Sequence, residues 1–276
     1  MLKPSAEQMA LLNGWERFSY RVAHIANHRF KWLFKWWNFF FTVGFVHVST
    51  SRRIRITGLE NLTNLDPASQ VLLVANHRSF FDFFIIGWIT YWKTKLSIRT
   101  FFPVRSTFFY EGAMGNLVNL VVGGLAMFPP VIRSKEKRAF NRFSIDKMVE
   151  LLDQPKTILG MHPEGTRSQD GDPYTFPSVR PGVGELAIRC KEAKVMPIFI
   201  LGLSNKIATE IKQNLVAVEG NEIDVVIGPP VELDDLRAKE ESKALYVEAA
   251  ERCMDAVRGL GDRQKEIAAE RLASRR

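Results

Sequence analysis

The sequence predicts an α/β protein with a mixed, largely parallel sheet flanked by helices and an N-terminal membrane-associated helical segment. Two observations predict the sheet. Short apolar runs alternate with helical patterns along the chain, and residues 71–75 are apolar throughout, as in a strand covered on both faces. The membrane segment is predicted by residues 30–50, the most apolar stretch of the chain. In such folds the functional loops follow the strands.

Residues 5–30 have the pattern of a polar to amphipathic helix, and residues 30–50 follow as an apolar one. The charge-free run 36–51 is shorter than the roughly 20 apolar residues that cross a bilayer, and neighbouring tryptophans and lysines resemble an interfacial belt. We therefore expect a helix that lies in one leaflet, and a protein associated with the cytoplasmic face of a membrane, peripheral or monotopic. A buried core helix is the alternative. No continuous apolar run opens the chain, so a cleaved secretory signal is not expected.

After this segment, strands and helices alternate. The spacing of apolar residues predicts strands at 52–57, 71–75, 123–130, 157–161, 195–201 and 223–227, and helices from 80 onward and at 134–152, 183–194 and 236–276. The aromatic, basic stretch 93–109 fits either core or a lipid-facing groove wall equally well. We divide the chain into N-terminal amphipathic helices (1–51), an α/β domain (52–232) and a charged helical tail (233–276).

The composition favours an anionic partner. Thirty-eight Lys and Arg against 30 Asp and Glu give a net charge of +8, which suits nucleic acid, phospholipid or a phosphorylated metabolite. The 20 Phe and 6 Trp favour a membrane, and because no aromatic and basic nucleic-acid motif is present we expect no nucleic-acid partner. Cys190 and Cys253 lie far apart and outside any CxxC pattern, so neither a disulfide framework nor a zinc site is predicted.

His77 and Asp82 flank the turn that follows the central strand. A histidine can take a proton from a hydroxyl, and a carboxylate on its other ring nitrogen fixes the tautomer and stabilises the imidazolium. The sequence therefore suggests a base with an orienting partner. The alternative is that Asp82 only caps the following helix, together with Ser79, and that His77 fills the end of a strand.

A second candidate loop, residues 164–168, follows the strand predicted at 157–161. A glycine lets backbone amides approach a ligand, hydroxyl groups donate hydrogen bonds, and an arginine binds phosphate through paired hydrogen bonds. The loop therefore suits a phosphate, although an ordinary surface turn has the same composition. Arg133 and Arg180 would add positive charge, or be solvated. The residues of the loop are Glu164, Gly165, Thr166, Arg167 and Ser168.

These two segments carry a resemblance to a known family. Residues 76–82, Asn-His-Arg-Ser-Phe-Phe-Asp, resemble the NHx4D motif of the glycerophospholipid acyltransferases, the PlsC-like 1-acylglycerol-3-phosphate acyltransferases. Residues 163–168, Pro-Glu-Gly-Thr-Arg-Ser, resemble the family's PEGTRS motif and follow in the same order. Residues 124–133 and 195–198 resemble its weaker second and fourth motifs. Two departures are His162, where the family usually has Phe, and Arg180, where Lys is more usual.

The resemblance implies an O-acyltransferase of phospholipid biosynthesis that makes phosphatidate from lysophosphatidate. His77 would be the general base, Asp82 would orient it, and Glu164, Gly165, Thr166 and Arg167 would bind or position the glycerophosphate, with Arg133 and Arg180 on the phosphate. It also implies acyl-CoA or acyl carrier protein as co-substrate, membrane phospholipids as partners, and neither a cofactor nor a metal. Another lysophospholipid or a glycolipid is an alternative acceptor, and a non-catalytic protein that binds anionic lipid is the alternative from another class.

Overall fold

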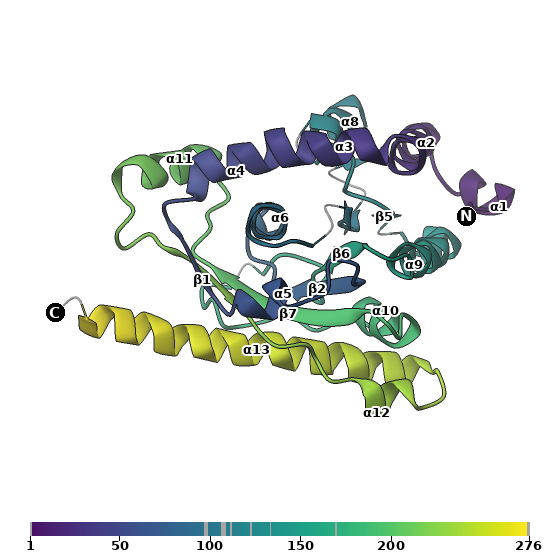
Figure 1. Ribbon diagram of the computed structural model, residues 1–276. Coiled ribbons are helices and arrows are strands. Elements are labelled where there is room, and N and C mark those ends of the chain that lie inside the picture. Colours follow the sequence, from purple (N-terminus) through teal and green to yellow (C-terminus); the bar gives the residue numbers. More distant parts are fainter. Residues whose placement is uncertain are drawn as a thin grey trace.

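The computed structural model describes residues 2–96, 99–105, 109–110, 112–121, 123–132, 134–168 and 170–274. Its main strands are β1 (Ile54–Thr57), β2 (Val71–Ala75), β3 (Thr100–Phe101), β6 (Ile158–Met161), β7 (Lys194–Leu201) and β8 (Ile223–Ile227). They form a six-stranded sheet in the order β1-β8-β7-β2-β6-β3, in which every neighbouring pair is parallel except β7 and β8 (Figure 1). The predicted mixed, mostly parallel α/β sheet is confirmed. A separate parallel pair joins β4 (Val104–Arg105) to β5 (Pro130–Val131).

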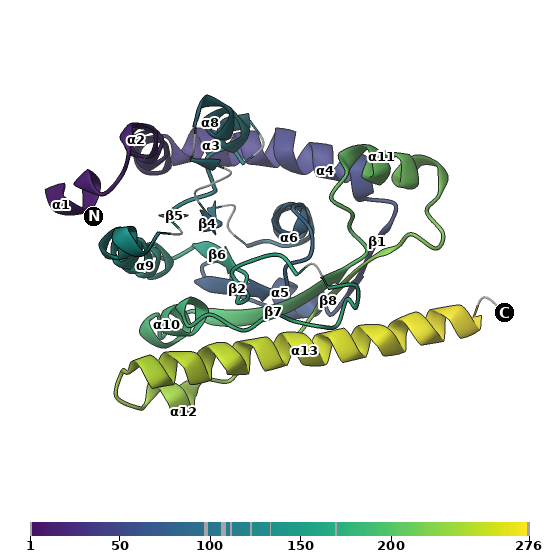
Figure 2. The same ribbon diagram turned by 180° about the vertical axis from the view of Figure 1, so that it is seen from behind.

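Helices cover both faces of this sheet (Figures 1 and 2). On one face lie α10 (Gly182–Arg189), α12 (Asp234–Arg237) and the 32-residue α13 (Lys243–Ser274), which contacts β2, β7 and β8. On the other face lie α6 (Asp82–Lys93) and α9 (Arg138–Leu152). Outside α6 is a further layer made of α2 (Gly14–Arg29), α3 (Lys31–Trp37), the π-helical turn η1 (Asn38–Thr42), α4 (Val43–Thr50), α8 (Gly112–Val121) and α11 (Ile207–Val216).

The helix predicted at 5–30 is two helices. The side chain of Asn13 accepts a hydrogen bond from the Glu16 amide, and the Glu16 carboxylate accepts one from the Asn13 amide, so a capping box starts α2 after α1 (Ala6–Ala10). The apolar helix predicted at 30–50 is helical along its length as α3, η1 and α4. Among the described residues, no helix is both long and apolar enough to cross a membrane. The association of this segment with a membrane stays a prediction.

The prediction of a strand at residues 123–130 is wrong. Residues 123–125 form a turn after α8, in which the Leu125 amide donates to the Asn119 carbonyl at 2.9 Å and Leu125 has a φ of 54°. Only Pro130 and Val131 pair as a strand. The helix predicted at 183–194 ends at Arg189, and Lys194 is already the first residue of β7. Helices α8 and α11 were not predicted, and the remaining short elements are α5 (Glu60–Thr63) and the 3-10 turn η2 (Lys135–Lys137).

The register of the central strands brings three loops together. Val74 of β2 pairs with Met161 of β6 on one side and with Pro197 of β7 on the other. Because all three strands are parallel, the loops that follow them leave the same edge of the sheet. Strand β2 is buried at every position, which explains its unbroken apolar sequence. The segments after β2 and β6 that the sequence singles out are therefore neighbours in space.

Candidate active site

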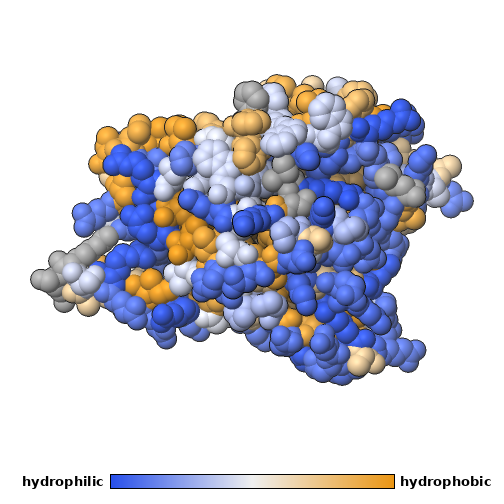
Figure 3. Space-filling view, viewed as in Figure 1, coloured by the Kyte–Doolittle hydropathy of each residue, from blue (hydrophilic) through white to orange (hydrophobic). Residues whose placement is uncertain are grey.

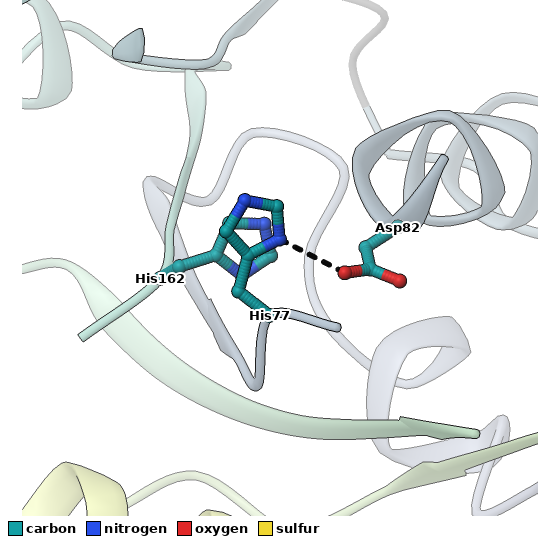
Figure 4. Close-up of side chains that lie close together, drawn as sticks. All are labelled: His77, Asp82 and His162. Atoms are coloured by element: carbon teal, nitrogen blue, oxygen red, sulfur yellow. Dashed lines mark hydrogen bonds and ion pairs between the residues drawn. The ribbon is translucent and has the colours of Figure 1, made fainter. Parts of the chain in front are cut away.

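His77 and Asp82 contact each other directly (Figure 4). His77 Nδ1 lies 3.0 Å from Asp82 Oδ2, and the backbone amides of Arg78 and Ser79 both donate to that oxygen at 2.9 Å. Because an ionised carboxylate only accepts hydrogen bonds, His77 donates from Nδ1, and Nε2 carries the lone pair. His77 Nε2 points away from Asp82 (Figure 4), and the His77 side chain is 21% exposed. The pair therefore has the geometry of a base with an orienting carboxylate.

Asp82, which accepts the hydrogen bond from His77, is buried and is the first residue of α6. Burial raises the pKa of Asp82 to about 6, while the neighbouring His162, the two amide hydrogen bonds and the charge of Arg167 act in the opposite direction. The alternative interpretation was that Ser79 and Asp82 only form a capping box, and just one of the two hydrogen bonds of that motif is present. The Ser79 amide donates to Asp82, but the Ser79 hydroxyl accepts from the Phe81 amide and donates to the Ser204 carbonyl.

Side chains on both sides of the turn tie it to strand β7. The amide side chain of Asn76 donates to the Ile200 carbonyl at 2.9 Å and accepts from the Ile200 amide at 2.8 Å. Farther on, the Phe80 amide donates to Asn205 Oδ1 at 2.8 Å, and Arg167 Nη1 donates to the same oxygen at 3.0 Å. The predicted base and Arg167 thus share one edge of the sheet. Sequence reasoning missed Asn205, although it lies four residues beyond the strand predicted at 195–201.

Arg78 holds the loop that follows the second motif. Its guanidinium donates to the carbonyls of Asp172 at 3.1 Å and Asp170 at 2.5 Å, and to the Ser168 hydroxyl at 3.4 Å. The Ser168 amide in turn donates to the His77 carbonyl at 2.8 Å. These contacts fix the position of the second motif relative to His77. Arg78 is therefore committed to protein carbonyls.

Glu164 is buried, with about 1% of its surface exposed. Neither of its carboxyl oxygens has a hydrogen-bond partner among the residues that the structure describes. Burial raises the pKa of Glu164 to about 8, and the nearby His77 amide and Arg78 lower it only in part. The carboxyl group is thus protonated at neutral pH. Its predicted contact with the substrate stays a prediction, and a buried, neutral group fits the positioning part of that prediction better than binding of an anion.

The other residues of the second motif lie nearer the surface. Gly165 has a φ of 63°, which favours glycine, and a Cβ there would lie 3.3 Å from Arg180 Cγ. Gly165, Arg167 and Arg180 are exposed and Thr166 is half-buried, while the Arg180 amide donates to the Pro163 carbonyl. Arg180 therefore lies against the loop, and its contact with a phosphate stays a prediction. Arg133 lies outside the described residues.

His77, Asp82 and His162 form the one group of possible metal ligands within the described ranges, their ligand atoms lying within 4.8 Å of one another. The two imidazole rings are 3° from parallel, with centroids 3.9 Å apart. A histidine binds a metal in the plane of its ring, and two nearly parallel planes this far apart do not share a position for one ion. His77 Nδ1 is also occupied by Asp82. The geometry suits proton transfer better than metal binding.

Comparison with known proteins identifies the family of this chain. A family model described as Acyltransferase matches residues 53–201, just over half of the chain, from the start of β1 to the end of β7. The chain therefore belongs to the PlsC-like acyltransferase family, and the resemblance noted from the two motifs is confirmed. No curated protein matches the sequence. Membership in this family supports an enzyme that transfers an acyl group to a lipid acceptor.

Proposed function

We propose that this acyltransferase moves a fatty acyl group from acyl-CoA or acyl carrier protein to the free hydroxyl of 1-acylglycerol-3-phosphate, giving phosphatidate. The observation that carries the proposal is the His77–Asp82 pair, at 3.0 Å, on the same edge of the sheet as Arg167. A lysophosphatidate offers a hydroxyl to the base and a phosphate to the arginine. Arg180, packed against Gly165, supports the same placement of the phosphate.

The proposed reaction needs no acyl-enzyme. His77 Nε2 takes the proton of the acceptor hydroxyl while the oxygen attacks the thioester carbonyl carbon. Asp82 stabilises the imidazolium that forms. The tetrahedral intermediate then collapses, the carbon–sulfur bond breaks, and the leaving thiolate takes the proton from the imidazolium. The products are an ester and a free thiol, and His77 returns to its neutral form.

An apolar cavity next to the turn supports an acyl substrate. It has a volume of about 300 Å³, lies between α4, α6, α8 and α11, and is lined by Phe81, Phe84 and Ile85 on the side of α6. Phe81 immediately precedes Asp82 in the chain. The walls of the cavity come mainly from α4, α6 and α11, and not from residues 93–109, which the sequence analysis considered as a groove wall. We assign the fatty acyl chain to this cavity.

The outer helical layer supports the proposed membrane association. Large apolar side chains are exposed along it, and Figure 3 shows apolar surface over the upper edge, where α11, α4 and α8 lie. Three exposed arginines of α2 add charge that attracts anionic lipid headgroups. The exposed residues are Trp15, Phe18, Trp32, Trp36, Phe40, Phe45, Val48, Leu117, Leu120, Leu215 and Val216. We propose that this layer rests on the cytoplasmic leaflet.

An acceptor panel tests the proposed reaction. The protein is given one labelled acyl-CoA with lysophosphatidate, other lysophospholipids, glycerol-3-phosphate and a glycolipid, and the product lipids are weighed by mass spectrometry. We expect phosphatidate from the native protein and a loss of at least a thousandfold in His77→Ala, because the base is removed. His47→Ala, which removes a histidine of α4, is the matched control and should retain activity.

Three results of this panel would contradict the proposal. Full activity in a folded His77→Ala variant removes His77 as the base, and a preference for another acceptor corrects the substrate. Lipid binding without transfer from either acyl-CoA or acyl carrier protein favours the non-catalytic alternative. Donors of different chain length, used in the same assay, test the cavity, because rates that do not depend on length would contradict its assignment.

Vesicle sedimentation tests the membrane contact. Trp32→Glu with Trp36→Glu should weaken binding to vesicles of phosphatidylcholine and anionic phosphatidylglycerol roughly tenfold or more, because two exposed indoles become charged. Leu272→Glu is the matched control, since this exposed leucine lies on α13, across the sheet from the outer layer (Figure 1). Equal binding by both variants would show that the outer layer does not touch the vesicle.

A further inference from the structure

His162 lies inside a stack of aromatic rings beneath His77. Its ring centroid is 3.9 Å from that of His77, at an interplanar angle of 3°, and 3.9 Å from that of Phe83 on the other face, at 26° (Figure 4 shows the two histidines). Phe83 in turn lies 4.6 Å from Phe102. Gly160 makes room for the stack, because a Cβ there would lie 2.6 Å from the ring of Phe102 and 3.1 Å from that of Phe83.

A hydrogen bond to the main chain of β2 fixes the orientation of the His162 ring. His162 Nδ1 lies 2.8 Å from the Ala75 carbonyl, which can only accept, so the proton is on Nδ1 and Nε2 has the lone pair. Nε2 is buried and has no hydrogen-bond partner in the part of the chain that the structure describes. Burial and the neighbouring His77 lower the pKa of His162 to about 3. The ring is therefore neutral at physiological pH and is not itself a base.

We propose that His162 is a positioning residue, whose neutral ring holds the His77 imidazole face to face and stabilises the imidazolium that forms there during acyl transfer. This inference rests on the proposed function, because it concerns the same base. His162 does not have to touch the substrate. It acts through the ring of His77.

Two physical arguments support this role. The hydrogen bond to Asp82 holds one edge of the His77 ring but leaves its tilt adjustable, and parallel contact over the whole ring face sets the tilt and hence the direction of Nε2. A displacement of about 1 Å at a reacting group can cost roughly a hundredfold in rate. In addition, a cation is attracted to the face of a neutral aromatic ring, so the stack favours the protonated form of His77 over the neutral one.

Apart from His162 itself, the charged and titratable groups around His77 are the same in every variant of His162. Asp82 binds His77 directly, Glu164 lies near the His77 amide, and Arg78 and Arg167 contribute positive charge. None of them belongs to the stack. His162→Leu and His162→Phe both remove the titratable imidazole of His162, which acts electrostatically on His77 and Asp82, so the difference between these two variants in the titration of His77 reports on the aromatic face.

The test compares His162→Leu with His162→Phe. Leucine fills the space without a π face, whereas phenylalanine keeps the ring and loses only the bond to the Ala75 carbonyl. In His162→Leu we expect the titration midpoint of the His77 ring, followed by NMR, to fall by about one pH value, and kcat/KM to fall roughly tenfold to a hundredfold. The acid limb of the pH profile should move to lower pH with it. His162→Phe should restore the midpoint and most of the activity.

Melting temperatures show whether each variant folds, and His162→Met, whose flexible side chain fills irregular space, replaces His162→Leu if the latter does not fold. A midpoint and profile unchanged in the non-aromatic variants would overturn the inference, as would a His162→Phe variant no better than His162→Leu. These outcomes differ from a failure of the proposed function. If the proposed function is wrong, the native protein transfers no acyl group, or His77→Ala remains active. The NMR titration midpoint of His77 would in that case still decide whether the stack affects His77.

Discussion

Asp82→Asn should lower kcat/KM for acyl transfer by roughly a hundredfold to ten-thousandfold while the protein stays folded. Three donors converge on Asp82 Oδ2, namely His77 Nδ1 and the amides of Arg78 and Ser79. An asparagine can place its carbonyl oxygen at the same point and accept all three hydrogen bonds. The turn is then kept, and the variant loses only the negative charge that stabilises the imidazolium of His77.

The pH dependence of the native enzyme's activity is a second test of whether the Asp82 carboxylate must be ionised. Burial raises the pKa of Asp82 to about 6, so the carboxylate is ionised above that pH and neutral below it. Neutralisation of Asp82 should therefore add to the loss of activity that protonation of the base His77 causes, and activity should fall as the pH drops through about 6. Asp255→Asn, on the exposed side of α13, is the matched control and should leave both rate and profile unchanged. Near-native activity in Asp82→Asn would show that the charge is not needed and that Asp82 serves the turn alone.

Much of this site could be predicted from the sequence, because it depends on strands with strong local signals. The fully apolar run 71–75 and the shorter run before Pro163 are strands, and parallel pairing places the ends of both at one edge. The contact between His77 and Asp82 followed from a strand-to-helix turn. In these cases local pattern and tertiary position agree.

Other features depend on long-range contacts that the local sequence does not reveal. Residues 123–130 are apolar and end in prolines like a strand, but a hydrogen bond to the Asn119 carbonyl of α8 holds residues 123–125 in a turn, and only Pro130 joins a strand. Asn205 enters the site through bonds to the Phe80 amide and to Arg167, which are 125 and 38 residues away in the chain. His162 was noted only as a departure from the family pattern. Its stacking on His77 needs the β2–β6 register and the space at Gly160.

Glu164→Gln should raise the stability of the protein, and the gain should grow with pH. In the folded state burial raises the pKa of Glu164 from 4.5 to about 8. Between these values the folded protein binds a proton that the unfolded chain has lost, so native stability falls as pH rises through this window and levels off above about 8. Glutamine has nothing to titrate. Its advantage should increase between pH 5 and pH 8 by up to roughly 1.4 kcal/mol per pH value, a few kcal/mol in total.

Urea unfolding from pH 5 to pH 9 measures this gain, with Glu266→Gln on the exposed face of α13 as the matched control. The control should show no stability gain comparable with that of Glu164→Gln. Curves for Glu164→Gln that run parallel to those of the native protein would show that the carboxyl group titrates normally and is hydrated. A stabilised variant with reduced acyl transfer would have a different meaning. It would show that the chain keeps an unpaired, buried carboxyl group next to His77 at a cost in stability, as expected of a group retained for the site and not for the fold.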